Sequence, residues 1–213
     1  MWILHRRDLF CFAAKSNEAA DLHGSIAYKD ELYADAPITD KGVLQCKDLQ
    51  QWIEKDSSLI KSVQLVLVSP LQRALQTASL TLPFLEGKVP WIALESLREA
   101  SGAHPCDRRR NKSSIVAEYP HICFDDLETE EDSLYSKYQD AREPPAAVIA
   151  RCNDFLEWLS RRTEDHIIVV SHSAYMDQLF GNVFDTTPEN SRRLNNCEMR
   201  TFVVALSGRI KDP

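Results

Sequence analysis

The segment from residue 65 to 77 reads LVLVSPLQRALQT, and it indicates the fold class. Its first four residues form an unbroken run of Val and Leu, which is typical of a strand buried on both faces. Ser69 and Pro70 then favour a helix start, because Ser caps helix N-termini and Pro suits the first helical position. Apolar residues continue at helical spacing at Leu71, Ala74, Leu75 and Ala78. The segment therefore predicts a buried strand that leads directly into a helix.

Arg73 lies on the first turn of this predicted helix. In open α/β sheets, ligands bind beyond the carboxyl ends of the strands. The N–H groups of a helix N-terminus favour an anion there, and a guanidinium adds bidentate recognition of phosphate or carboxylate. The plain alternative is a solvated surface arginine, but the strand end and the Ser-Pro pair favour an anion-binding role.

Strands and helices alternate along the rest of the chain. This alternation predicts a three-layer α/β/α sandwich with a mostly parallel sheet. Helices are expected at residues 43–54 (with Thr39 or Asp40 as N-cap), at 146–161, from Ala174 onward and from Pro188; further strands are expected at residues 2–5, 91–94, 166–170 and 199–206.

Length and composition indicate an ordinary globular protein. The 213 residues are expected to form one domain, residues 1–213, with an irregular insertion at about residues 95–145. An acidic run at residues 125–132 within the insertion is expected to be a solvated face. The net charge of −7 argues against nucleic acid or an anionic membrane as the main partner. No apolar run approaches the ~20 residues that a membrane span needs.

The six cysteines predict reduced thiols in a cytoplasmic protein, since they are widely spread and include no CxxC pair. The first fifteen residues are basic and partly apolar, but they lack the Ser enrichment and cleavage site of a targeting leader. Two HxC pairs, at residues 104–106 and 121–123, do not fit a common zinc-finger spacing. We therefore expect no metal and no other cofactor.

Chemically useful side chains follow three further predicted strands. His172 comes directly after the strand at 166–170, and Glu99 closely follows the strand at 91–94. His5 and Arg6 follow the first strand. Alone, each would most simply be a structural histidine or a surface charge. Together with Arg73 they could supply a nucleophilic imidazole, cationic clamps and a proton donor.

Five stretches in register resemble the histidine phosphatase (phosphoglycerate mutase-like) superfamily, in the form seen in plant and algal phosphoglycerate mutase-like proteins. They are PITDKGVLQC (37–46), SPLQRALQTA (69–78), LREASGAHPCDRR (97–109), VVSHSAYM (169–176) and NCEMRTFVV (196–204).

The resemblance implies a role for each matching residue. Arg73 would clamp the phosphoryl group, Glu99 would be the acid and His172 the second active-site histidine. Ser173 would offer a backbone N–H to the substrate, and Arg108 a further contact. The implied activity is a metal-independent phosphatase that acts on a small phosphorylated molecule through a phosphohistidine, with phosphoglycerate mutase activity as a variant.

The chain departs from the family at the nucleophile, which lies in an RHG triplet just after the first strand. Here residues 4–8 read LHRRD, and no Gly follows the His-Arg pair. By residue type His5 would be the nucleophile and Arg6 a clamp, whereas by alignment position Arg6 replaces the nucleophile. A third interpretation is that the first twelve or so residues stand in place of a lost RHG segment. The altered motif also supports a different hypothesis, a pseudophosphatase that binds phosphate or a phosphorylated partner without turnover.

Overall fold

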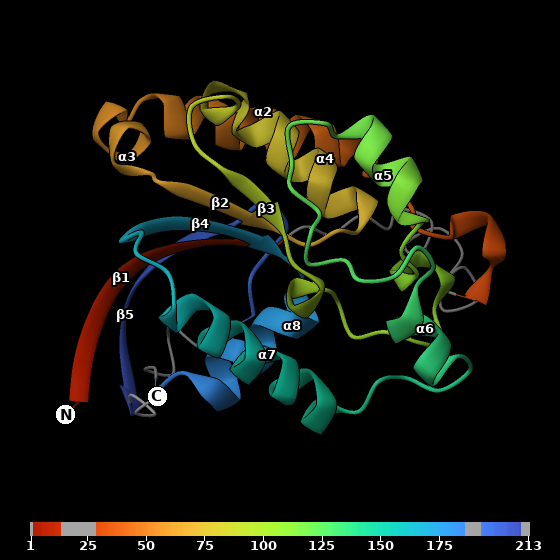
Figure 1. Cartoon of the computed structure of the whole chain (residues 1–213). Coiled ribbons are helices and arrows are strands. Elements are labelled where there is room, and N and C mark those ends of the chain that lie inside the picture. The colour runs from red at the N-terminus through yellow and green to blue at the C-terminus, as the bar shows by residue number, and fades with distance from the viewer. Residues whose placement is uncertain (1, 14–28, 186–192, 210–213) are drawn as a thin grey trace.

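The computed structural model describes residues 2–13, 29–185 and 193–209. Its centre is one five-stranded sheet with the strand order β3-β2-β4-β1-β5 (Figure 1). Four strands are parallel, and β5 runs antiparallel beside β1. The strands are β1 (Trp2–Ala13), β2 (Leu65–Val68), β3 (Trp91–Ala93), β4 (His166–Ser171) and β5 (Met199–Arg209).

Helices cover both faces of this sheet, which confirms the predicted α/β architecture (Figure 1). One face carries α2 (Asp40–Glu54), α3 (Ser57–Ser62) and α4 (Gln72–Thr81). The other carries α7 (Pro145–Ser160) and α8 (Ser173–Gln178), which continues into a π-helical turn at Leu179–Val183. The segment expected to form a helix from Pro188 lies outside the described residues.

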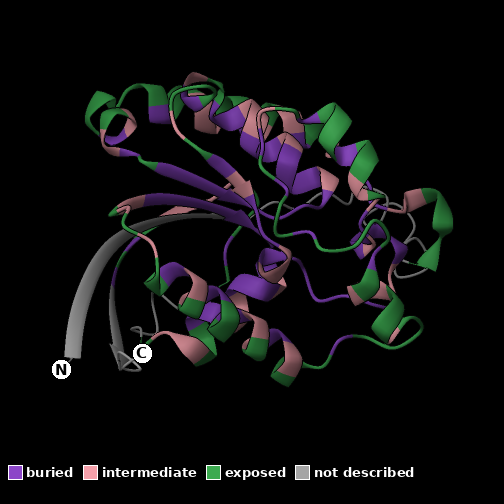
Figure 2. Cartoon of the chain, viewed as in Figure 1, coloured by how far each residue is buried: buried purple, intermediate pink, exposed green. Residues whose placement is uncertain are grey.

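Strand β2, which lies between β3 and β4, shows how the sequence builds the layers. All four of its residues are buried, as an unbroken apolar run predicts (Figure 2). Leu65 and Leu67 pack in the core on the side of α7, whereas Val66 and Val68 pack in the core on the side of α4. Side chains alternate between the two faces of a strand, so one short run supplies both cores.

Two local predictions are settled at helix starts. Thr39 is the N-cap of α2, because its hydroxyl accepts a hydrogen bond from the N–H of Gly42 at 3.1 Å. The prediction that Ser69 caps the next helix is wrong, since the N-cap of α4 is Leu71 and has no side-chain capping bond. The Ser69 hydroxyl instead lies beside the ring of His172.

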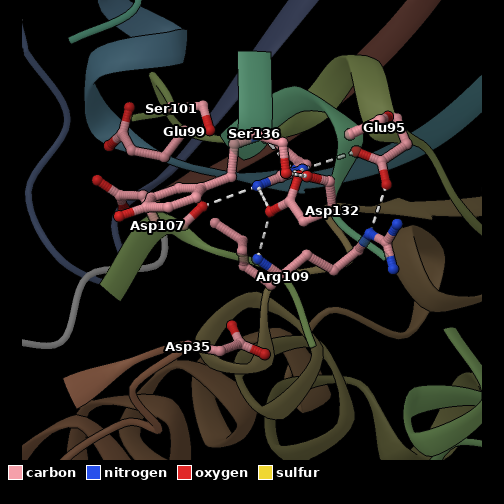
Figure 3. Close-up of polar contacts among 12 residues, drawn as sticks. Asp35, Glu95, Glu99, Ser101, Asp107, Arg109, Asp132 and Ser136 are labelled. Atoms are coloured by element: carbon pink, nitrogen blue, oxygen red, sulfur yellow. Dashed lines mark hydrogen bonds and ion pairs between the residues drawn. The ribbon is translucent and has the colours of Figure 1, made fainter. Parts of the chain in front are cut away.

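The segment between β3 and α7 is irregular but well packed. It contains short 3₁₀ turns, η4 (Glu95–Leu97) and η5 (Pro105–Asp107), and two helices, α5 (Lys112–Glu118) and α6 (Ser133–Tyr138). The prediction that the whole acidic run is solvated is wrong at Asp132, which is buried. Its carboxylate bonds the guanidinium of Arg98, which is completely buried (Figure 3). One residue of this acidic run, Asp132, therefore belongs to a buried ion pair.

The first strand is longer than the sequence predicts. It runs to Ala13 and not to His5, so His5 and Arg6 lie within β1 and not at its end. The apolar residues from Leu9 to Ala13 pair with β4. Among the described residues, no helix is long and apolar enough to cross a membrane.

Candidate functional site

Three of the predicted site residues follow the carboxyl ends of three neighbouring strands. Arg73 is the second residue of α4, which follows β2. Glu99 follows the turn η4 beyond β3, and His172 is the residue between β4 and α8. All three side chains are buried. Since β2, β3 and β4 are parallel neighbours, the three residues lie at the same edge of the sheet.

His172 contacts Ser69, the residue that the sequence predicted to be a helix N-cap. The Nε2 atom of His172 lies 2.8 Å from the hydroxyl oxygen of Ser69. The two residues follow adjacent parallel strands whose ends pair at Val68 and Val170, and the Ser69 N–H donates to the Val170 carbonyl at 2.9 Å. This register brings a serine hydroxyl to the imidazole and fixes its orientation. The sequence signal was present, because both residues directly follow a buried strand.

Glu99 reaches the start of α8 and so joins the neighbourhood of His172. One carboxyl oxygen accepts from the N–H of Ala100 at 2.9 Å, and the other accepts from the N–H of Ala174 at 3.3 Å. Burial raises the pKa of Glu99, the nearby Asp107 carboxylate raises it further, and the Arg73 charge opposes the shift. A carboxyl group with a raised pKa keeps its proton at higher pH, which suits a proton donor.

Arg73 is anchored by the segment that carries Glu99. Its Nη1 donates to the Cys106 carbonyl at 2.7 Å, and its Nη2 donates to Asp107 at 2.7 Å. Arg142 bonds the other oxygen of Asp107 at 2.5 Å. Sequence reasoning missed Asp107, although it lies in the stretch that resembles the family. The buried carboxylate of Asp107 thus pairs with two guanidinium groups beside the proposed acid.

The backbone around Glu99 is fixed by an ion pair from α7. Arg151 donates to the carbonyls of Ser96 and Arg98, both at 2.9 Å, and pairs with Glu143 at 2.7 Å. The N–H of Ser101 donates to Glu143 at 3.0 Å. The predicted α7 helix therefore positions the acid-bearing segment as well as covering the sheet.

Gly102 allows the next turn of this segment. Its φ is +75°, and a Cβ atom there would lie 2.1 Å from the carbonyl oxygen of Ala141. A larger residue would therefore strain the backbone and push the two segments apart.

The two substrate-contact candidates have separate surroundings. Ser173 begins α8 beside His172, and its hydroxyl accepts from Arg193 at 3.0 Å. Arg108 instead pairs with Glu31 at 2.5 Å and lies over the Tyr135 ring. Arg108 also lines a hollow of about 440 Å³ together with Asp35 and other residues. Its described contacts do not join it to Arg73, Glu99 or His172.

The register of β1 removes His5 and Arg6 from this site. Ala13 pairs with Ser171, the residue before His172, whereas the first β1 residue paired with β4 is Asp8. His5 comes eight residues before Ala13, so at about 3.3 Å per strand residue it lies roughly 26 Å away along β1. Figure 1 shows the N-terminal part of β1 at the far end of the sheet from α8. The expectation that His5 and Arg6 stand at a strand end of the site is therefore wrong.

The donor set at the site does not resemble a metal centre. Among residues 29–185 and 193–204, no group of three or more His, Cys, Asp or Glu side chains is arranged to hold a metal ion. The HxC residue His121 packs its ring against Trp91, with the ring centroids 5.2 Å apart. Positive charge at the site comes from arginine side chains.

Comparison with known proteins identifies the family. The family model described as "Histidine phosphatase superfamily (branch 1)" matches residues 23–209. The chain belongs to the histidine phosphatase superfamily. The match begins after the segment that contains His5.

Curated relatives agree with this assignment. A "Phosphoglycerate mutase-like protein" of Arabidopsis thaliana is 32% identical over 215 residues, covering 86% of this chain and 78% of the relative. A second Arabidopsis thaliana protein, "Phosphoglycerate mutase-like protein 1", is also 32% identical, covering 84% of this chain and 73% of the relative. Membership of the superfamily supports a phosphatase-like or mutase-like function.

Solved structures with low sequence identity share the fold. The alpha-ribazole phosphatase from Shigella flexneri superposes with a TM-score of 0.60 at 20% identity, covering 91% of this chain and 89% of that one. A phosphoglycerate mutase from Bacillus anthracis superposes with a TM-score of 0.58 at 15% identity, covering 98% and 94% of the two chains. These two solved structures therefore share the fold of this chain.

The raised pKa of Glu99 predicts a pH-dependent stability. Between the ordinary value of 4.5 and the raised value, the folded protein binds a proton that the unfolded chain has released. Stability is therefore expected to fall as pH rises through this window, and Glu99→Gln should flatten that part of the profile. Urea unfolding midpoints of both proteins across pH test this. Identical slopes for parent and variant would contradict the raised pKa.

Proposed function

We propose that this protein binds the phosphoryl group of a small phosphorylated molecule at the site formed by Arg73, His172 and Ser173, with Glu99 beside it. We further propose that turnover through a phosphohistidine is impaired in this sequence, as in a pseudophosphatase. The observation that carries the proposal is the β1 register. In this register His5 lies far along β1 from Ala13, which pairs with Ser171, the residue before His172.

Charge supports the binding half of this proposal. Arg73 stays protonated at any physiological pH, and its planar guanidinium can offer paired donors to phosphate oxygens. A bound dianion also favours the protonated, cationic form of His172. Ser173 lies at the start of α8, where a backbone N–H can face an anion. No metal is needed for such a clamp, because the side-chain cations supply the positive charge.

The proposal that turnover is impaired rests on the sequence at the end of β1. Ala13, the last residue of β1, pairs with Ser171, and the next residue in the sequence is also an alanine. The family places its RHG triplet just after the first strand, and here residues 13–15 read AAK. An alanine has no lone pair with which to attack phosphorus.

The second candidate is an active, metal-independent phosphatase, and the raised pKa of Glu99 favours it. In that reaction an imidazole nitrogen attacks phosphorus and the phosphorus–oxygen ester bond breaks. The leaving oxygen takes the proton from Glu99, and water later hydrolyses the phosphohistidine. Transfer to a second hydroxyl in place of water would make the protein a mutase.

Turnover of p-nitrophenyl phosphate and 3-phosphoglycerate separates the candidates. We expect no turnover above background by the parent and no change on His5→Ala. The triple variant Ala13→Arg/Ala14→His/Lys15→Gly should gain turnover, because it restores the family triplet from the last residue of β1 onward.

A matched control keeps the result interpretable. Adding His172→Ala to the triple variant should abolish the gained turnover. Turnover by the parent that disappears on His5→Ala would overturn the hypothesis of impaired turnover and establish the active phosphatase.

A further inference from the structure

Two thiols meet outside the proposed phosphate site. Cys46 is buried on α2, and Cys197 is half-buried in the turn that leads into β5. Their sulfur atoms lie 3.7 Å apart, although the residues are 151 positions apart in the chain. Proximity of this kind is set by the tertiary fold, so the pair is a feature of the folded protein alone.

The geometry allows a covalent bond after a small movement. A disulfide needs a sulfur–sulfur distance of about 2.05 Å, so the two atoms must approach by roughly 1.7 Å. Cys197 can provide this movement, because it is a turn residue that precedes the ladder of β5. Its φ of +53° lies in the left-handed region, which costs energy for a residue other than glycine. Movement of this turn would therefore take Cys197 out of a backbone conformation that is already unfavourable.

The surroundings of the pair favour the thiolate form of Cys46. The S–H of Cys197 lowers the pKa of Cys46, burial opposes this, and the hydroxyls of Thr77 and Thr81 lower it further. The thiolate is the form that attacks oxidants and disulfides. Cys197 is the partner nearer to solvent, so a small oxidant reaches the pair from its side.

We propose that Cys46 and Cys197 form a reversible disulfide when the protein meets a peroxide. The Cys46 thiolate attacks one peroxide oxygen, the O–O bond breaks, and the departing hydroxide takes up a proton to leave as water. The sulfur of Cys197 then attacks the resulting sulfenic acid. The S–S bond forms, the S–O bond breaks, and the hydroxide released combines with the Cys197 proton as a second water. One peroxide thus accepts two electrons from two thiols, and a thiol reductant reverses the change.

The disulfide would act on the helix that carries Arg73. Thr77 and Thr81, which interact with Cys46, lie on α4. The hydroxyl of Thr77 also donates to the carbonyl of Arg73 at 2.7 Å. Oxidation would therefore join α2 to the start of β5 at a point that adjoins α4. Because the bond closes a long loop of the unfolded chain, it should raise the thermal unfolding midpoint.

Peptide mapping of the full chain tests the proposal directly. After treatment with hydrogen peroxide and digestion without reductant, we expect one cross-linked peptide pair that contains Cys46 and Cys197. The free-thiol count should fall by two, and dithiothreitol should restore both thiols.

Matched variants separate this pair from general oxidation. Cys46→Ser and Cys197→Ser should each prevent the cross-link, whereas Cys123→Ser, which alters an exposed thiol, should leave it intact. Mapping of the unaltered protein gives the answer even if a variant fails to fold. Oxidation to sulfinic acid at Cys46, a different cysteine pair, or no cross-link would each overturn the proposal.

Discussion

Replacement of Arg73 by alanine is expected to lower the affinity for inorganic phosphate by roughly 100-fold. Two charge-assisted hydrogen bonds to a phosphate contribute about 3 kcal/mol in total, and 1.4 kcal/mol corresponds to a factor of ten. We expect phosphate binding to depend on Arg73, because the Arg73 side chain is buried and its guanidinium bonds the segment that carries Glu99. Calorimetric titration of phosphate into parent and variant measures the effect.

The control for this variant is Arg161→Ala, which removes an exposed arginine at the end of α7. It should leave phosphate affinity unchanged, as a surface charge distant from a site is largely screened. Arg142 still pairs with Asp107 when Arg73 is removed, so the variant should fold, and its thermal unfolding checks this. Equal phosphate affinity for parent and Arg73→Ala would contradict the assigned role.

Asp132→Asn is expected to destabilise the protein by about 3 kcal/mol, because the completely buried Arg98 loses its buried carboxylate partner. Arg98 then keeps only its ion pair with the more exposed Glu95, at 3.0 Å. The two terminal guanidinium nitrogens of Arg98, Nη1 and Nη2, donate to Asp132 at 2.6 and 2.5 Å. The carboxylate also accepts from the backbone N–H groups of Arg109 and Tyr135 (Figure 3). One substitution therefore disturbs the whole link between η4, η5 and α6.

Urea unfolding measures this loss, with Glu128→Gln as the control. Glu128 belongs to the same acidic run but is exposed, so its loss should leave the midpoint nearly unchanged. The pKa of Asp132 is pushed up by burial but lowered overall by its bonds with Arg98 and the backbone. Its stabilising effect should accordingly disappear as pH falls through that lowered pKa. An Asp132→Asn midpoint equal to that of Glu128→Gln would contradict this account.

The sequence predicted the parts of the fold that depend on local pattern. The apolar runs of β2 and β4 and the helical stripes of α2 and α7 are strong signals, because each element buries a face that its own residues define. The ends of elements were less predictable. β1 continues beyond His5 through three charged residues, since pairing with β4 and β5 decides where that strand ends.

The candidate site was partly predictable for a related reason. Arg73, Glu99 and His172 each follow a strand, so their gathering at one sheet edge follows from a parallel sheet. The partners Ser69 and Asp107 depend on side-chain contacts between distant segments. Ser69 has strong local capping propensity, but its hydroxyl is engaged by His172 across the neighbouring strand. Tertiary contacts of this kind leave no periodic pattern in the sequence.

The measurement that tests the central claim most directly is phosphate titration of the unaltered protein in a sample also assayed with p-nitrophenyl phosphate. We expect saturable binding of one phosphate per chain, together with no turnover above background. Such a result fits a cationic site that binds phosphate in a chain whose residues 13–15 read AAK where the family has its RHG triplet. Absence of phosphate binding, or turnover by the same sample, would contradict the account.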